Sequence, residues 1–208
     1  MARRAKQVAI PGKTRKIEFL MHPLKTSTSH PLRIDSVAVG RARGRIGLTF
    51  CPGKKQSDAQ SGVWDRSLDD DMKVIKAFGA AALITLMPDS ELRSLRVPPY
   101  QIRDKASELG IEWHQLPIPD QGTPDQTFED SWATVGPRLR AFLKAGHNIV
   151  VHCKGGLGRT GTIAARLLIE SGADPEMAIR CVRKARPGAI ENSRQEQYVL
   201  SCSSEEFG

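Results

Sequence analysis

The sequence predicts an α/β fold, a three-layer sandwich in which helices cover both faces of a central, mostly parallel sheet. From residue 45 onward, short apolar segments alternate with amphipathic segments of helical spacing. This alternation is typical of parallel strands joined by crossover helices. One segment, residues 80–87, is apolar along its whole length and bounded by Gly79 and Pro88, as expected of a strand buried on both faces.

The other predicted strands are also short and bounded by turn residues. Residues 46–51 end at a Pro-Gly pair, residues 111–118 follow a glycine, and residues 148–152 precede a glycine-rich stretch. Gly and Pro commonly interrupt regular structure in this way. The segment before residue 45 has room for one further edge strand.

Capping residues and apolar spacing predict the helices. Ser67 precedes an acidic first turn and a helix that ends before Gly79. A capping box is expected at residues 123–126, where the longest helix begins, and Pro137 should kink or restart that helix because an interior proline costs about 3 kcal/mol. Further helices are predicted over residues 98–109, 160–171, 174–186 and 193–203.

Positive charge is concentrated near the N-terminus. The net charge is +8, and the first 45 residues carry eleven Lys and Arg against Glu18 and Asp35. We therefore predict a basic arm over residues 1–44 and a compact domain over residues 45–208. Such an arm could contact an acidic partner, but no aromatic residues interleave its charges, so nucleic acid is not an obligatory ligand. Without a secretory signal or an apolar run of membrane-spanning length, the expected location is the cytoplasm.

The cysteines form no short C-x-x-C pair, so the sequence predicts no zinc site, no disulfide framework and no cofactor. Cys181 is expected in the core, on an apolar stripe of the 174–186 helix. That stripe consists of Ala178, Cys181, Val182 and Ala185.

Residues 151–161, Val-His-Cys-Lys-Gly-Gly-Leu-Gly-Arg-Thr-Gly, lie between a predicted strand and a predicted helix. An α/β sheet places its ligand crevice at this end of its strands. Three glycines let the backbone curl, so that successive N–H groups can converge on a phosphate at the positive end of the helix. The Lys-Ser/Thr ending of a nucleotide-binding loop is missing. The residues predicted to bind substrate are Lys154, Gly155, Gly156, Leu157, Gly158 and Arg159.

Side chains of this loop suit phosphate transfer. The same N–H groups favour the thiolate form of Cys153, which makes it a candidate nucleophile. Arg159 offers two parallel donors to two phosphate oxygens. The hydroxyl of Thr160 is expected to hydrogen-bond the sulfur, and His152 is expected to order the loop.

The pattern His-Cys-x5-Arg-Thr at residues 152–160 resembles the signature of the cysteine-dependent phosphatase superfamily, in its dual-specificity branch. Residues 47–53, 91–98 and 117–125 narrow the resemblance to the group of cyclin-dependent-kinase-associated phosphatases. This resemblance implies a metal-independent phosphoprotein phosphatase that hydrolyses phosphotyrosine, and also phosphoserine or phosphothreonine, through a phosphocysteine intermediate. A phosphoinositide or other small-molecule phosphatase, and a non-catalytic phosphate-binding module, remain alternatives.

The resemblance also implies a general acid, which protonates the leaving oxygen. Asp120, 33 residues before Cys153, occupies the family position. Asp125 is the competing carboxylate, but it falls in the predicted capping box. Gln195 matches a glutamine of related proteins that touches the hydrolytic water, although a surface helix residue is an alternative interpretation.

Overall fold

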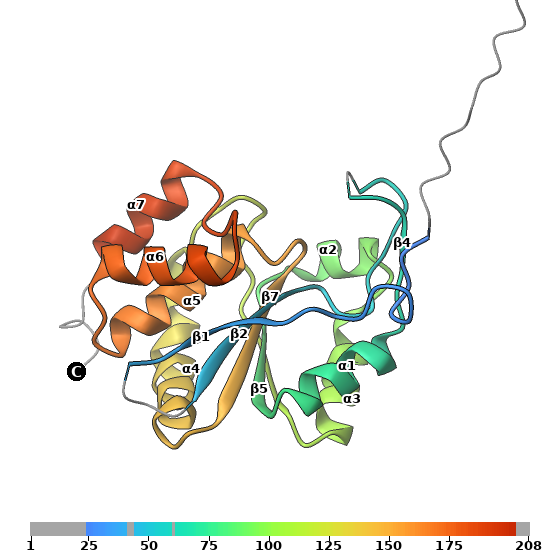
Figure 1. Cartoon of the computed structure of the whole chain (residues 1–208), viewed down its shortest axis with the longest axis horizontal. Coiled ribbons are helices and arrows are strands. Elements are labelled where there is room, and N and C mark those ends of the chain that lie inside the picture. The colour runs from blue at the N-terminus through green and yellow to red at the C-terminus, as the bar shows by residue number, and fades with distance from the viewer. Residues whose placement is uncertain (1–23, 41–43, 60, 203–208) are drawn as a thin grey trace, which may run out of the picture.

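A five-stranded mixed sheet forms the centre of the molecule (Figure 1). This computed structural model describes residues 24–40, 44–59 and 61–202. The strand order is β1-β2-β7-β5-β6, with β1 antiparallel to β2 and the other neighbours parallel. The predicted α/β class is confirmed. The strands are β1 (Asp35–Ala38), β2 (Arg45–Phe50), β5 (Ala80–Thr85), β6 (Glu112–Gln115) and β7 (Asn148–Cys153), and β3 (Lys55–Gln56) and β4 (Trp64–Asp65) form a separate pair.

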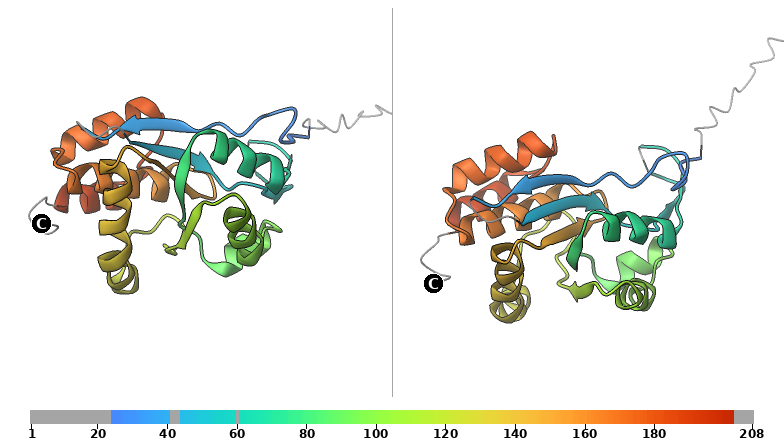
Figure 2. Two further views of the ribbon diagram at one scale, coloured as in Figure 1. Left: turned by 90° about the horizontal axis from the view of Figure 1, so that it is seen from below. Right: turned by 60° about the horizontal axis from the view of Figure 1, so that its bottom comes forward.

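Helices lie on both sides of this sheet (Figures 1 and 2). One group is α1 (Leu68–Ala77), α2 (Asp89–Ser94) and α3 (Pro99–Glu108), and the other is α4 (Gln126–Lys144), α5 (Gly158–Glu170), α6 (Pro175–Ala185) and α7 (Ser193–Ser201). Helix α5 is buried along its whole length, because it packs on β7 and β2 and is covered by α4, α6 and α7. Within the described part of the chain, no helix has the length and apolar character needed to cross a membrane.

Most predicted helices are present and begin at capping side chains. Ser67 Oγ accepts from the Asp70 N–H at 3.2 Å at the start of α1. At the start of α4, the N-cap is Asp125, whose Oδ1 accepts from the Phe128 N–H at 2.9 Å. The helix therefore begins two residues later than predicted: its N-cap is Asp125, and not the first residue of the predicted capping box at residues 123–126. The sequence reading missed α2, β3 and β4, since elements of two to six residues are too short to show a periodicity.

The expected restart of the longest helix at Pro137 and the expected core position of Cys181 are both wrong. Helix α4 continues without a restart through Pro137; the carbonyl that loses its helical partner belongs to Ala133, which is exposed, so water can bond it. Cys181 is exposed and not in the core. The buried stripe of α6 runs through Ala178, Ile179 and Val182, because the helix is rotated to bury the larger isoleucine.

Residues 24–40, the described part of the predicted arm, pack on the body. β1 supplies the edge strand for which the sequence had room, and Leu32, Val37 and Val39 are buried. The predicted boundary at residue 44 therefore does not separate these residues from the compact domain. Residues 1–23 lie outside the described residues.

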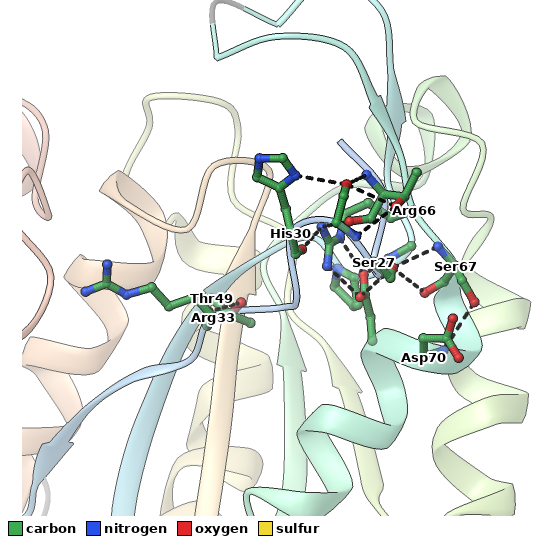
Figure 3. A network of polar contacts seen from close by, with 12 residues as sticks. Ser27, His30, Arg33, Thr49, Arg66, Ser67 and Asp70 are labelled. Atoms are coloured by element: carbon green, nitrogen blue, oxygen red, sulfur yellow. Dashed lines mark hydrogen bonds and ion pairs between the residues drawn. The ribbon is translucent and has the colours of Figure 1, made fainter. Parts of the chain in front are cut away.

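A network of polar contacts that includes Ser27, His30 and Arg66 fastens this N-terminal segment to the body (Figure 3). Arg66 and Asp71 are both fully buried and pair at 2.7 Å. Arg66 Nη1 also donates to the His30 carbonyl at 2.6 Å, and Ser27 Oγ donates to Asp71 Oδ1 at 2.9 Å. Further along, Thr49 Oγ1 on β2 donates to the carbonyl of Arg33 at 2.9 Å.

Deleting residues 1–40 should lower the free energy of unfolding by several kcal/mol, because burial of each of Leu32, Val37 and Val39 contributes roughly 1.5–3 kcal/mol. Urea unfolding measures the loss. Deleting residues 1–23 is the control, since it removes none of the contacts described above. Equal unfolding midpoints for the two deletions would show that β1 adds nothing to the domain.

Candidate active site

The sulfur of Cys153 lies at the carboxyl end of the central strand β7, in a pocket of about 750 Å³. The loop of residues 153–159 continues directly into α5, so the first turn of that helix faces the same pocket. The Gly156 N–H donates to Cys153 Sγ at 3.2 Å. Pocket-lining residues include Lys54, Asp120, Cys153, Lys154, Gly155 and Arg159.

Two of the three loop glycines are closely packed. Gly156 has φ +73°, and a Cβ there would lie 2.3 Å from the carbonyl oxygen of Thr49. A Cβ on Gly158 would lie 2.4 Å from Glu191 Oε2, which accepts from the Gly158 N–H at 2.7 Å. A Cβ on Gly155 would meet no atom within 4 Å. The backbone of β2 therefore requires glycine at 156, whereas a side chain at 158 would displace the ends of the Glu191 and Gln195 side chains, and position 155 is open.

Arg186, at the end of α6, holds the loop from outside. Its Nη2 donates to the Gly155 carbonyl at 3.1 Å, its Nε donates to the Gly156 carbonyl, and its Nη1 pairs with Asp35 on β1 at 2.8 Å. A trans peptide points its C=O and the following N–H in opposite directions. Holding these carbonyls outward therefore turns the N–H groups of Gly156 and Leu157 inward. The sequence analysis identified neither Arg186 nor Asp35.

The guanidinium of Arg159 is held in a fixed orientation. Glu91 on α2 binds it through both carboxylate oxygens, at 2.6 and 2.8 Å, and the Ile118 carbonyl accepts from Nη1 at 3.1 Å. Although burial opposes the charge, the Glu91 carboxylate raises the pKa of Arg159 above its usual value. Glu91 was not predicted from the sequence as a site residue. It could have been identified from the family resemblance, because it belongs to the 91–98 segment that carries this resemblance.

Asp120 lies beside Arg159, on the loop that follows β6. Its Oδ1 accepts from Arg159 Nη2 at 2.9 Å and from the Gln121 N–H at 3.1 Å, while 63% of the side chain stays exposed. Asp125 caps α4 and is not among the residues that line the pocket. Of the two candidate carboxylates, the structure brings Asp120 to the site.

Gln195 is fully buried, so its interpretation as a surface helix residue is wrong. Its Oε1 accepts from the Glu191 N–H at 3.0 Å and its Nε2 donates to the Gly122 carbonyl at 3.2 Å. Asn192 donates to the carbonyl of Gln121, which has a left-handed φ of +57°. The start of α7 thus fixes the strained turn that carries Asp120.

His152 and Thr160 are both fully buried behind the loop. Trp113 Nε1 donates to Thr85 Oγ1 at 2.8 Å, so the Thr85 hydroxyl is free to donate to His152 Nε2 at 2.7 Å. Burial lowers the pKa of His152 to about 3, hence the ring is neutral near pH 7. The Thr160 hydroxyl has no hydrogen-bond partner among the described residues, so the expected bond to Cys153 is not formed in this structure.

Of the residues predicted to bind substrate, Lys154, Gly155 and Arg159 line the pocket, whereas Leu157 precedes α5 as its N-cap. Gly156 and Gly158 contribute to the curl of the loop through their backbone.

Comparison with known proteins gives three consistent results. Residues 65–199 match the family model described as "Swiss Army Knife protein, DSP-PTPase phosphatase domain". The chain is 33% identical over 157 residues to the rat protein named cyclin-dependent kinase inhibitor 3, covering 74% of this chain and 69% of the relative. It is 26% identical over 161 residues to mouse dual specificity protein phosphatase CDC14B, covering 76% of this chain and 29% of the relative.

A solved structure of kinase associated phosphatase, with its catalytic-site cysteine replaced by serine, superposes with a TM-score of 0.69 at 31% identity. The match covers 81% of this chain and 92% of that chain. The family model, the curated relatives and the solved structure all point to the same family, and the loop between β7 and α5 carries its cysteine and arginine. We conclude that the chain belongs to the DSP-PTPase family of protein phosphatases.

Proposed function

We propose that this protein hydrolyses phosphotyrosine, and also phosphothreonine or phosphoserine, in protein substrates through a phosphocysteine intermediate. The observation that carries the proposal is the meeting of Cys153, Arg159 and Asp120 in one pocket, at the positive end of α5. Because the intermediate requires a reduced thiol, we place the enzyme in a reducing compartment, the cytoplasm.

In the first step the thiolate of Cys153 attacks phosphorus, the bond from phosphorus to the leaving oxygen breaks, and Asp120 gives that oxygen a proton. The Gly156 N–H already donates to the sulfur. Arg159 presents Nε and Nη2 to the phosphoryl oxygens once Asp120 leaves Nη2 for the leaving-group oxygen. Arg159 can follow the charge that spreads over these oxygens during transfer, because Glu91 fixes its plane.

In the second step water attacks phosphorus and the phosphorus–sulfur bond breaks. Asp120, now a carboxylate, takes a proton from the water, and inorganic phosphate leaves. The buried hydroxyl of Thr160, which has no partner among the described residues, is available to donate to the departing sulfur. His152 stays neutral and orders the loop through Thr85.

Turnover of matched phosphotyrosine and phosphothreonine peptides and of a phosphoinositide tests the substrate class. We expect both peptides to be hydrolysed faster than the lipid. A higher kcat/KM for the phosphoinositide would contradict the proposal and favour the small-molecule alternative.

Asp120→Asn should slow hydrolysis of a phosphotyrosine peptide by roughly 10²–10⁴-fold, because the leaving phenolate, whose conjugate acid has a pKa of about 10, then departs without a proton. An aryl phosphate with a more acidic phenol should lose much less. Steady-state kinetics on both substrates checks this difference.

Asp125→Asn is the matched control. Asp125 caps α4, so its replacement should affect both substrates alike and mainly reduce stability, by about 1 kcal/mol. Leaving-group dependence in Asp125→Asn, and none in Asp120→Asn, would reverse the assignment of the acid.

A further inference from the structure

Lys54 is a buried cation at the edge of the candidate active site. It follows β2, is only 5% exposed, and lines the same pocket as Cys153 and Arg159. Its Nζ lies 4.7 Å from the ring centre of Phe50 and 4.6 Å from that of Trp64. Lys54 was not identified in the sequence, where it is one of a pair of lysines after a Pro-Gly turn.

A neighbouring cation shows what Lys54 lacks. Arg66 lies over the same two rings, at 5.0 and 5.6 Å, and donates to both carboxylate oxygens of Asp71, at 2.8 and 2.7 Å. No carboxylate of the described residues lies within ion-pair distance of Lys54. A buried ammonium without a carboxylate partner is costly, so an anion delivered from outside would gain a favourable partner.

The electrostatic surroundings agree with this geometry. Burial, with smaller contributions from Arg66 and Lys154, lowers the pKa of Lys54 to about 8, while Cys51 and Cys153 act in the opposite direction. The direction of this shift is the one expected of a buried lysine that has no carboxylate partner among the described residues.

The sheet order places Lys54 away from Asp120. The loop after β2 flanks the 153–159 loop on one side, whereas the loops after β5 and β6, which carry Glu91 and Asp120, lie on the other. Lys154 belongs to the 153–159 loop itself, between these two sides, and lines the pocket. Within the described residues it has no ion-pair partner. Its carbonyl accepts from the Cys51 N–H at 3.4 Å, which ties it to the loop of Lys54.

There is room for substrate on this flank. A second hollow of about 710 Å³ adjoins the pocket and shares Lys154, Gln56 and Asp58 with it. A polypeptide whose phosphorylated residue enters the first pocket can therefore continue past Lys154 into the second.

We propose that Lys54 and Lys154 form a second anion-binding subsite, which takes a carboxylate or phosphate carried by a residue next to the phosphorylated residue of a protein substrate. This inference rests on the proposed function, because it assigns specificity to the same pocket. The enzyme would then prefer phosphorylated residues that have an acidic or phosphorylated neighbour.

The test compares phosphotyrosine peptides that differ at one flanking position, occupied by alanine, glutamate or phosphoserine, on either side of the phosphotyrosine. Charge-assisted hydrogen bonds predict a kcat/KM roughly 10- to 100-fold higher for the better acidic peptides than for the alanine peptide. The glutamate and phosphoserine arms distinguish the two anion sources.

In Lys54→Met the preference for acidic peptides should fall to less than about threefold, because methionine keeps the apolar contact with the two rings but carries no charge. Lys73→Met is the matched control: Lys73 on α1 is exposed, pairs with Asp70, and lines neither hollow. It should keep the preference of the wild-type protein. The melting temperature of ligand-free Lys54→Met should equal or exceed that of wild type, since an unpaired buried charge is removed.

An unchanged preference in Lys54→Met, or an equal loss in Lys73→Met, would overturn the subsite. So would a wild-type enzyme that shows no preference. If Lys54→Met does not fold, the ratio of kcat/KM between acidic and alanine peptides is measured with Lys154→Met, since Lys154 is only half-buried. A ratio equal to that of the wild-type protein in this variant overturns the proposal. Wild-type turnover of the alanine peptide tests the proposed function separately.

Discussion

Replacing Cys153 by serine is expected to reduce turnover of a phosphotyrosine peptide by on the order of 10⁴-fold or more, because a serine hydroxyl is not ionised near neutral pH and is a much weaker nucleophile than a thiolate. Binding of the peptide should persist. The donors to phosphate are backbone N–H groups and the guanidinium of Arg159, which Glu91 and Arg186 hold in place independently of the sulfur.

Single-turnover kinetics and calorimetric binding of the same peptide measure the two effects separately. Cys181→Ser is the matched control, since Cys181 is an exposed free thiol on α6, and it should leave both quantities within about twofold of wild type. Retention of more than about a tenth of the activity in Cys153→Ser would assign the nucleophile to another group.

The second large effect is expected from Arg159→Lys, which should lower kcat/KM by roughly 10²–10³-fold, as loss of a donor to transition-state charge does. Lysine keeps the charge, so Glu91 is not left as an uncompensated buried anion. It cannot, however, bind the carboxylate of Glu91 and two phosphoryl oxygens at once, because its ammonium lacks the planar fork of donors.

Glu91→Gln separates positioning from charge. It leaves Arg159 in place but removes the bidentate ion pair, and we expect kcat to fall about tenfold with little change in KM. The matched control is Arg93→Lys on the same short helix, where an exposed arginine pairs with exposed Asp89; its activity should not change. Wild-type turnover in Arg159→Lys would show that the planar grip plays no part in the reaction.

The sequence by itself determined the features that depend on neighbours along the chain. Apolar runs between turn residues predicted the parallel strands, and Ser67, with the acidic turn after it, predicted the start of α1. The 153–159 loop was predicted because its glycines, cysteine and arginine lie within seven consecutive residues. The family resemblance favoured Asp120 over Asp125, whereas the position of Asp125 as the N-cap of α4 was decided by the structure.

Only the tertiary structure decided the partners of these groups. Glu91 meets Arg159 across 68 residues, and Asp35 meets Arg186 across 151. The first contact follows from the strand order, which places the loop after β5 beside the end of β7, and the second follows from the packing of α6 on β1. The order of the strands in the sheet cannot be derived from a single sequence without related sequences.

Burial was likewise decided by tertiary packing. Lys54 and Lys55 are indistinguishable in the sequence, yet the first is enclosed by Phe50 and Trp64 while the second is exposed. Gln195 is buried and Cys181 exposed, both against the simpler interpretation of their helices. The physical reason is common to all four: periodicity shows that a helix or loop has an apolar side, but which side chains it encloses depends on the elements packed against it.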